Sequence, residues 1–283
     1  MRAFIIIILT GFALNAAAQP STYTRADSAE IVALLQNGQP STLHFAKKLL
    51  GRPYVAHTLE VNDDERLVVN TRQLDCTTLV ETVTALTLCA MQDKRTFSDF
   101  THALTQLRYR QGRMDGYPSR LHYFSDWIDD KVLMGLVSEV QGKEKPFTAV
   151  QRLDINYMSQ HPDSYKALRK QPELVKQIAA QERALTGREY RYIPKSEVRN
   201  TALLRSTIHD GDIIAITCKK PGLDIAHLGF AVWKSDGLHL LNASQLHKKV
   251  VLEPMLLRTY LSKHPSHTGI RVIRIQQETL NNN

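Results

Sequence analysis

The sequence predicts an α+β fold in which helices come first along the chain and an antiparallel β-sheet comes last. Two observations favour this order. Apolar residues recur at helical spacing through the first half of the chain, most clearly in residues 76–91. After Asp210 the pattern changes to short apolar runs separated by Gly, Pro and Asp, which is typical of antiparallel strands joined by tight turns.

The helical part is predicted from apolar periodicity and from capping residues. We expect helices over residues 28–35, 43–50, 76–91 and 97–110, and a short strand within 66–72. Ser41 is a suitable N-cap for the second helix, and Gly51 is a suitable stop signal after it. The strand leads directly into the helix that begins near residue 76.

The second half contains an expected insertion and the sheet. Residues 109–127 form a polar, aromatic-rich stretch, and a helical or mixed block follows to about residue 140. Helical but very polar sequence then predicts an insertion around 150–190 that covers the core. The expected strands lie within residues 211–216, 228–233, 238–244, 250–252 and 269–276.

The first 18 residues have the pattern of a signal peptide, because Arg2 precedes an apolar run and Ala16-Ala17-Ala18 offers a cleavage site. We expect one mature domain over 19–283, since no Gly/Ser-rich or Pro-rich linker divides it. No later stretch reaches the roughly 18 apolar residues of a membrane span. These features predict an exported, most simply periplasmic, protein without a stable membrane anchor.

Composition excludes several classes of function. The formal charge is +8, but the basic residues are scattered and do not alternate with aromatic ones, so we expect no nucleic-acid partner. Of the three cysteines, Cys89 and Cys218 lie in apolar runs, where burial explains them. No pair of Cys or His at ligand-like spacing is matched by a second pair, so we expect no metal and no other cofactor.

Cys76 is the candidate nucleophile. It follows Asp75 at the predicted start of a helix, where unpaired backbone amides and the helix dipole favour a thiolate. The same amides can receive the oxyanion that develops on an attacked carbonyl. From this position alone, a buried cysteine at a helix start without a catalytic role is an equally good interpretation.

His227 is the candidate base for this thiol. It lies at the start of an expected strand, between the small residues Ala226 and Gly229. Asn242 follows 15 positions later on the next expected strand, so a hairpin can bring it to the His227 ring. A hydrogen-bonding group at that place would hold the tautomer that leaves one ring nitrogen free as a base.

Five segments, in this order, resemble the N-acetylmuramoyl-L-alanine amidase-like family, a branch of the NlpC-type cell-wall cysteine peptidases. They are Gly51-Arg52-Pro53-Tyr54, Asp75-Cys76-Thr77-Thr78, residues 117–127, the His227 strand and Asn242-Ala243-Ser244. The resemblance spans about residues 30–275. It implies a papain-like core in which the helix of the nucleophile packs on the C-terminal antiparallel sheet.

The resemblance also implies an activity, namely hydrolysis of the amide that joins N-acetylmuramic acid to L-alanine in peptidoglycan fragments, including anhydro-muropeptides. Cys76 would attack the carbonyl, His227 would move the proton and Asn242 would orient the ring. Relatives often have His at this third position, so Asn242 departs from the pattern. The expected partner is a peptidoglycan-derived disaccharide-peptide, and the oligomeric state is left open.

Further residues are expected to contact the substrate. Tyr54 matches a tyrosine that relatives place beside the nucleophile, and aromatic and polar side chains in residues 117–127 suit a sugar. The substrate-binding candidates are Tyr54, Asp75, Arg120, His122, Tyr123, Asp126, Trp127 and Ser244. For Asp75, capping the helix is an equally good role. For Tyr54, Tyr123 and Trp127, a place in the core is the alternative.

Three other functions use the same residues or the same fold. An NlpC-type endopeptidase would cut the stem peptide between D-glutamate and the diamino acid with the same catalytic set. A non-catalytic muropeptide-binding protein would need neither Cys76 nor His227, yet both are present. Acyl transfer by a related thiol enzyme would differ only in the acceptor.

Overall fold

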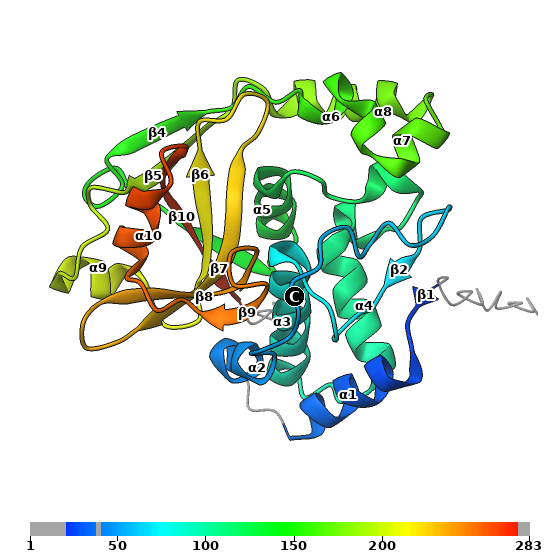
Figure 1. Ribbon diagram of the computed structural model, residues 1–283, viewed down its shortest axis with the longest axis horizontal. Coiled ribbons are helices and arrows are strands. Elements are labelled where there is room, and N and C mark those ends of the chain that lie inside the picture. Colours follow the sequence, from blue (N-terminus) through cyan, green and yellow to red (C-terminus); the bar gives the residue numbers. More distant parts are fainter. Residues whose placement is uncertain (1–20, 38–40, 277–283) are drawn as a thin grey trace, which may run out of the picture.

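The structure is a computed structural model that describes residues 21–37 and 41–276 (Figure 1). The predicted signal peptide, residues 1–18, lies outside these residues. The described part has the predicted α+β order, with helices before most of an antiparallel sheet. None of its helices combines the length and the apolar character that crossing a membrane requires.

The first half of the chain is helical, as predicted. Its helices are α1 (Arg25–Gln36), α2 (Thr42–Lys48), α3 (Cys76–Met91), α4 (Phe97–Arg108) and α5 (Phe124–Leu133). Two 3₁₀ turns, η1 (Arg110–Gly112) and η2 (Tyr117–Ser119), separate α4 from α5. The expected strand within 66–72 is only β2 (Leu67–Val68), which pairs in parallel with β1 (Ser21–Thr22).

The start of α1 is bound to the segment that leads to α3. The buried Asp27 carboxylate accepts hydrogen bonds from the Thr71 backbone N–H at 3.0 Å and from the Thr24 backbone N–H at 2.9 Å. Burial alone would raise the pKa of Asp27, but these hydrogen bonds outweigh it and hold the pKa at about 2. This contact fixes the loop before Cys76.

The central helix is α3, and its burial explains why its sequence is apolar on every side. Every residue from Thr78 to Ala90 is buried, between α1, α2 and α4 on one side and the sheet on the other. One buried ion pair crosses this packing, because Arg108 Nε of α4 donates to Glu81 at 2.7 Å. The helix therefore holds its N-terminus at a fixed place beside the sheet.

The sheet has the strand order β4-β5-β10-β6-β7-β8-β9, with β3 also paired to β10, and every pairing in it is antiparallel. The strands at its centre are β6 (Ile213–Cys218), β7 (Ile225–Trp233), β8 (Leu238–Ser244) and β10 (His267–Ile275). The strand β9 (Lys249–Leu252) completes its C-terminal part, and these five strands confirm the predicted antiparallel sheet. The strand β3 (Val137–Val140) was not predicted, because the sequence analysis expected a helical or mixed block to about residue 140.

The expected helical insertion is bounded by two strands that the sequence analysis did not predict. Between β4 (Ala149–Arg152) and β5 (Glu189–Pro194) lie α6 (Tyr157–Gln160), η3 (Pro162–Ser164), α7 (Lys166–Lys170) and α8 (Leu174–Leu185). The two strands pair with each other, and β5 adds them to the sheet through β10. The insertion projects beyond the end of the sheet and lies above α4 in Figure 1.

Helices cover both faces of the sheet (Figure 1). On one face, β7 and β8 pack on α3, and alternate residues such as Phe230 and Leu241 belong to the core of the helical part. On the other face, Ala231 and Leu240 belong to a second core with α9 (Ala202–Thr207) and α10 (Leu257–Lys263). This alternation is what a strand buried on both faces requires.

Candidate active site

Cys76 is the first residue of α3, and Asp75 is its N-cap. The Asp75 carboxylate accepts from the Thr78 backbone N–H at 2.8 Å, and Thr78 Oγ1 accepts from the Asp75 N–H at 2.9 Å. This capping box fixes the first turn of the helix. Asp75 therefore has the capping role that the sequence allowed, and its side chain also lines a cavity.

The Cys76 thiol is protonated at neutral pH. Burial raises its pKa to about 12, and the neighbouring Asp75 carboxylate acts in the same direction. The Leu228 backbone, the Thr77 side chain and the Cys76 backbone favour the thiolate and oppose this shift without outweighing it. The sequence argument considered the helix dipole alone and did not include burial or the Asp75 charge, which have the larger effect on the pKa. A nucleophilic Cys76 therefore needs a base that removes its proton.

The imidazole of His227 has the protonation state that a base needs. Asn242 Nδ2 donates to the Leu240 carbonyl at 3.4 Å, so its Oδ1 faces His227 Nε2 at 3.0 Å as an acceptor. His227 Nε2 must then carry the proton, which leaves the lone pair on Nδ1. Burial lowers the pKa of His227, so the ring is neutral at neutral pH.

Register explains how Asn242 reaches His227. Strands β7 and β8 pair up to Phe230 opposite Leu241, and Asn242 is the next residue on β8. Asn242 is 1% exposed, so its side chain has no access to bulk solvent. A Cβ on Gly229 would lie 2.7 Å from the Leu241 carbonyl oxygen, so only glycine allows this approach of the two strands.

Cys76 and His227 line the same cavity, which has a volume of about 180 Å³. Its other walls come from Thr77, from residues 122–124, from residues 223–228 around the start of β7, and from Met158 and Tyr165 of the insertion. Within the part of the chain that the structure describes, no hydrogen bond joins the Cys76 sulfur to the His227 ring. The shared cavity brings the two residues together, and their catalytic pairing stays a prediction.

Tyr54 lies beside the nucleophile, which is the place that the family resemblance implied for it. Leu74 N–H donates to the Pro53 carbonyl at 3.0 Å and Val55 N–H donates to the Leu74 carbonyl at 3.1 Å, which places Tyr54 against the residues before Cys76. Burial raises the pKa of Tyr54, and the proximity of Cys76 and Asp75 raises it further. The phenol therefore keeps its proton and can donate a hydrogen bond.

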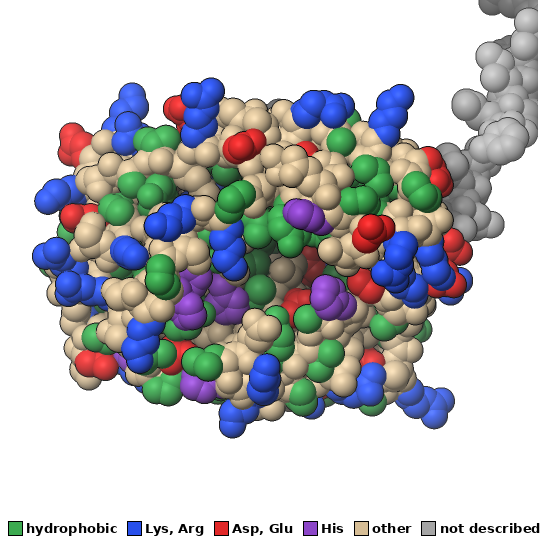
Figure 2. All heavy atoms as spheres, turned by 45° about the horizontal axis from the view of Figure 1, so that its top comes forward, with side chains coloured by type: hydrophobic (Ala, Val, Ile, Leu, Met, Phe, Trp, Pro, Cys, Tyr) green, Lys and Arg blue, Asp and Glu red, His purple; other side chains and the backbone are tan. Residues whose placement is uncertain are grey.

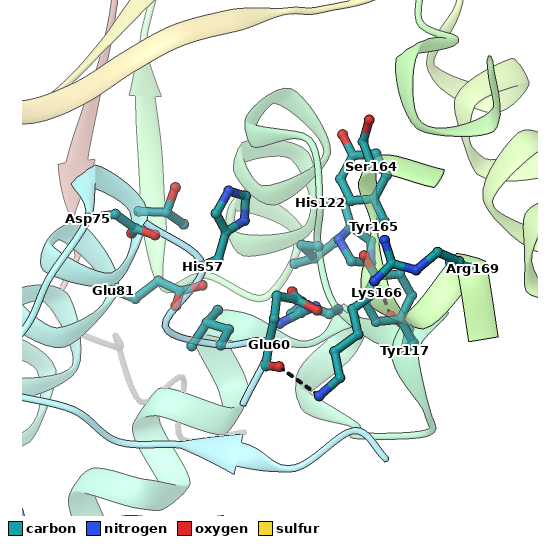
Figure 3. Close-up of a pocket in the computed structure, with 14 residues that line it drawn as sticks. His57, Glu60, Asp75, Glu81, Tyr117, His122, Ser164, Tyr165, Lys166 and Arg169 are labelled. Carbon is teal, nitrogen blue, oxygen red and sulfur yellow. Dashed lines mark hydrogen bonds and ion pairs between the residues drawn. The ribbon is translucent and has the colours of Figure 1, made fainter. Parts of the chain in front are cut away.

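A second, larger cavity of about 460 Å³ begins at the same helix terminus (Figure 3). Thr77, His122 and Tyr165 line both cavities, so the two are neighbours. Figure 2 shows a hollow near the middle of one face of the molecule, with several histidine side chains around it. The arrangement suits a substrate that extends past Cys76 in two directions.

Three of the predicted substrate-binding residues line these cavities from the stretch 109–127. Arg120 is 5% exposed and forms an ion pair with Glu60 at 2.5 Å, so its charge is already neutralised. His122 lines both cavities, and burial, followed by the charge of Arg120, lowers its pKa to about 3. Tyr123 lines the smaller cavity and donates its hydroxyl proton to Glu182 at 2.6 Å.

Three other predicted residues do not line either cavity. Trp127 is 1% exposed and stacks on Phe124 at 4.7 Å, so its indole belongs to the core and cannot stack on a sugar. Asp126 forms an ion pair with Arg110. Ser244 is buried and accepts a hydrogen bond from the His247 N–H at 3.2 Å. The structure gives these three side chains packing and loop-fixing roles.

The sequence analysis missed two groups of residues. The insertion contributes Ser164, Tyr165, Lys166 and Arg169 to the larger cavity, although its polar sequence predicted only a cover for the core. Three aromatic side chains from α10, from its C-cap and from the start of β10 lie near the His227 ring. They are Tyr260 at 6.3 Å between ring centroids, His264 at 4.7 Å from Tyr260, and His267 at 4.6 Å from His264.

These three residues are four and then three positions apart in the sequence. This spacing could have indicated that they share one face near a helix end. Next to the candidate site and elsewhere in the described residues, no group of three or more His, Cys, Asp or Glu side chains could hold a metal ion. The groups that the site brings together are a thiol, an imidazole and hydrogen-bond donors.

Comparison with known families gives one matching family model. A family model described as AmiA-like, N-acetylmuramoyl-L-alanine amidase-like, matches residues 44–270. That range includes Cys76, His227 and Asn242. No match was found among curated proteins.

Solved structures give the same comparison in three dimensions. A crystal structure of an N-acetylmuramoyl-L-alanine amidase from Bacteroides uniformis is 43% identical, with a TM-score of 0.78 over 84% of this chain and 98% of that chain. A Bacteroides fragilis structure, provisionally named a xylanase, is also 43% identical, with a TM-score of 0.76 over 82% and 100% of the two chains. A Legionella pneumophila structure at 23% identity, with a TM-score of 0.68 over 88% and 94%, shares the fold.

Proposed function

The chain belongs to the N-acetylmuramoyl-L-alanine amidase-like family, and from this premise we propose that it is a cysteine amidase acting on peptidoglycan fragments. The bond hydrolysed is the amide between the lactyl group of N-acetylmuramic acid and L-alanine, in fragments that include anhydro-muropeptides. The observation that carries the proposal is the cavity that Cys76 and His227 share, with Asn242 bound to the His227 ring. In this mechanism Cys76 is the nucleophile, His227 the base and Asn242 the group that orients it.

The raised pKa of Cys76 decides the order of the first step. Because the thiol is protonated, His227 Nδ1 removes its proton as the sulfur attacks the carbonyl carbon. The oxyanion of the tetrahedral intermediate accepts hydrogen bonds from the Cys76 backbone N–H and the Tyr54 hydroxyl. Imidazolium then donates its proton to the leaving amine as the C–N bond breaks.

The second half of the reaction repeats this chemistry with water. The released peptide leaves behind a thioester between Cys76 and the muramoyl carbonyl. His227 takes a proton from water, the hydroxide attacks the thioester, and the thiolate leaves and is reprotonated by the imidazolium. Throughout, the Asn242 acceptor keeps the ring oriented and stabilises the positive charge that develops on it.

The proposal extends to the architecture and to the compartment. The packing of the α3 N-terminus beside the antiparallel strand of His227 supports assignment to the papain-like core of NlpC-type peptidases. The sequence pattern of residues 1–18 supports export, and we propose the periplasm as the compartment. Both assignments agree with a substrate that comes from the cell wall.

The xylanase name of one relative calls for different chemistry, and the cleft does not favour it. A glycosidase uses two carboxylic acids on opposite sides of the scissile bond. The carboxylates that line the larger cavity already have partners, because Glu60 binds Arg120, Glu81 binds Arg108 and Asp75 caps α3. We therefore prefer the thiol mechanism.

Product analysis tests the proposal. The purified protein is incubated with disaccharide-peptide, and the products are identified by mass spectrometry. Release of the intact stem peptide is the expected result, whereas cleavage inside the stem peptide would identify an endopeptidase. Cys76→Ala should abolish turnover, while Cys89→Ala, in the same helix but outside both cavities, should retain it. Binding of the fragment by wild type without turnover would identify a binding protein.

A further inference from the structure

We propose that Arg169, on the helical insertion, binds a carboxylate on the peptide side of the scissile amide. This inference rests on the proposed amidase function and deepens it, because it assigns an acidic peptide to the larger cavity. Arg169 lies on α7 and lines the cavity of about 460 Å³ from the side opposite to His57 and Asp75 (Figure 3).

Among the Lys and Arg side chains that line this cavity, Arg169 is the one without a carboxylate partner in the described residues. Arg120 binds Glu60 at 2.5 Å and is almost fully buried. Lys166 forms an ion pair with Asp63 at 3.1 Å and donates to the Glu60 backbone carbonyl at 3.2 Å. The Arg169 guanidinium donates only to one backbone carbonyl, at 3.2 Å. Most of its N–H donors are therefore available to a ligand.

The carboxylates on the opposite side of the same cavity do not compete for Arg169. Glu81 is held by Arg108 at 2.7 Å, and both side chains are buried. Asp75 is held by the Thr78 amide at the start of α3. An acidic ligand that enters the cavity thus meets one cation whose charge no protein carboxylate neutralises, and a guanidinium binds a carboxylate through two parallel hydrogen bonds.

The cavity connects Arg169 to the nucleophile. Thr77, the residue after Cys76, lines both cavities, and Tyr165 lines both from the insertion that also carries Arg169. A peptide whose first amide lies at Cys76 can therefore extend into the larger cavity. The acidic residue of a stem peptide follows its first residue directly, so its carboxylates lie within a few bonds of the scissile amide.

The smaller cavity does not suit that half of the substrate. Its walls are mainly apolar or aromatic, and the charged residue that lines it is Asp224. The Asp224 carboxylate is buried and accepts from the Ser125 N–H at 2.6 Å. A second carboxylate there would lose its hydration beside a like charge, which is unfavourable. The two cavities therefore differ in the charge that they accept.

Steady-state kinetics with two substrates tests this assignment. One is N-acetylmuramoyl-L-alanyl-D-glutamate with free carboxylates, and the other is its diamide. For R169Q we expect KM for the free acid to rise about fivefold, because Arg169 is exposed, with kcat unchanged. KM for the diamide should not change. K170Q is the matched control, because Lys170 is on the same helix, forms an ion pair with Asp63 and does not line the cavity.

An equal effect of R169Q on both substrates, or no effect on either, would overturn the inference and leave the amidase function intact. If wild type hydrolyses neither substrate, the proposed function fails, and a binding measurement then tests the role of Arg169 separately. In that case L-alanyl-D-glutamate is titrated against wild type and R169Q and followed by NMR. Equal dissociation constants would then overturn the role of Arg169, whereas weaker binding by R169Q would support it.

Discussion

The hydrogen bond between His227 and Asn242 gives the sharpest quantitative prediction. In Asn242→Ala the His227 Nε2–H loses the acceptor at 3.0 Å that Asn242, itself 1% exposed, provides, and the alanine side chain offers no replacement. Leaving a buried donor without a partner costs about 1–3 kcal/mol. If the tautomer and orientation of the ring matter only in the transition state, kcat should fall about 5- to 150-fold and KM should stay the same.

The pH profile separates this orienting role from a general loss of stability. The Asn242 hydrogen bond raises the pKa of His227, although burial keeps it below the ordinary value. Without the bond the pKa falls further, so the acid limb of the kcat profile should move to lower pH. Asn242→Asp keeps an acceptor and adds a negative charge, so its acid limb should move to higher pH. An Asn242→Ala enzyme with wild-type kcat and an unshifted profile would refute the reasoning.

Four other changes have definite expected outcomes. Cys76→Ser should reduce kcat by at least about 10³-fold with the melting temperature unchanged in calorimetry, because a hydroxyl is a far weaker nucleophile. Arg108→Ala leaves the Glu81 carboxylate buried and unpaired, and should lower the free energy of unfolding in urea by about 3–5 kcal/mol. Gly229→Ala should lower it by about 1–3 kcal/mol, since the new methyl group meets backbone. Asp27, whose pKa is about 2 in the folded protein against an ordinary value of 3.8, should contribute about 2 kcal/mol of stability above pH 4 that is lost as the pH falls towards 2. Stability curves of Asp27→Asn that keep this loss would contradict the last prediction.

The sequence predicted elements whose signal is local. The apolar periodicity of residues 76–91 and the N-cap at Asp75 are sufficient to place α3 to the residue. By contrast, β4 and β5 were not predicted, because polar and charged residues such as Gln151, Arg152, Glu189 and Arg191 make them resemble the polar insertion between them. Their strand conformation comes from pairing with each other, which is a tertiary effect.

Among the site residues, too, those with a local signal could be predicted and those placed by tertiary structure could not. His227 and Asn242 are linked by a short hairpin, so their contact could be inferred from spacing. Trp127 was expected at the substrate because an aromatic residue in a polar stretch suits either a sugar or a core, and composition does not distinguish them. Arg169 reaches the cavity only because the insertion folds back over it, which no local pattern records.

The attachment of the insertion has a consequence for the cell that makes this protein. Glu182 of α8 accepts from the Tyr123 hydroxyl at 2.6 Å and from the Met158 N–H at 2.9 Å, and Gln181 donates to the Pro118 carbonyl at 2.7 Å. These bonds hold the insertion in place as one wall of the larger cavity, and we expect a cavity walled in this way to favour short fragments over long glycan strands. For the proposed amidase, lytic enzymes would then have to supply the fragments, and we expect high levels of it to leave the intact sacculus and the osmotic resistance of the cell unharmed.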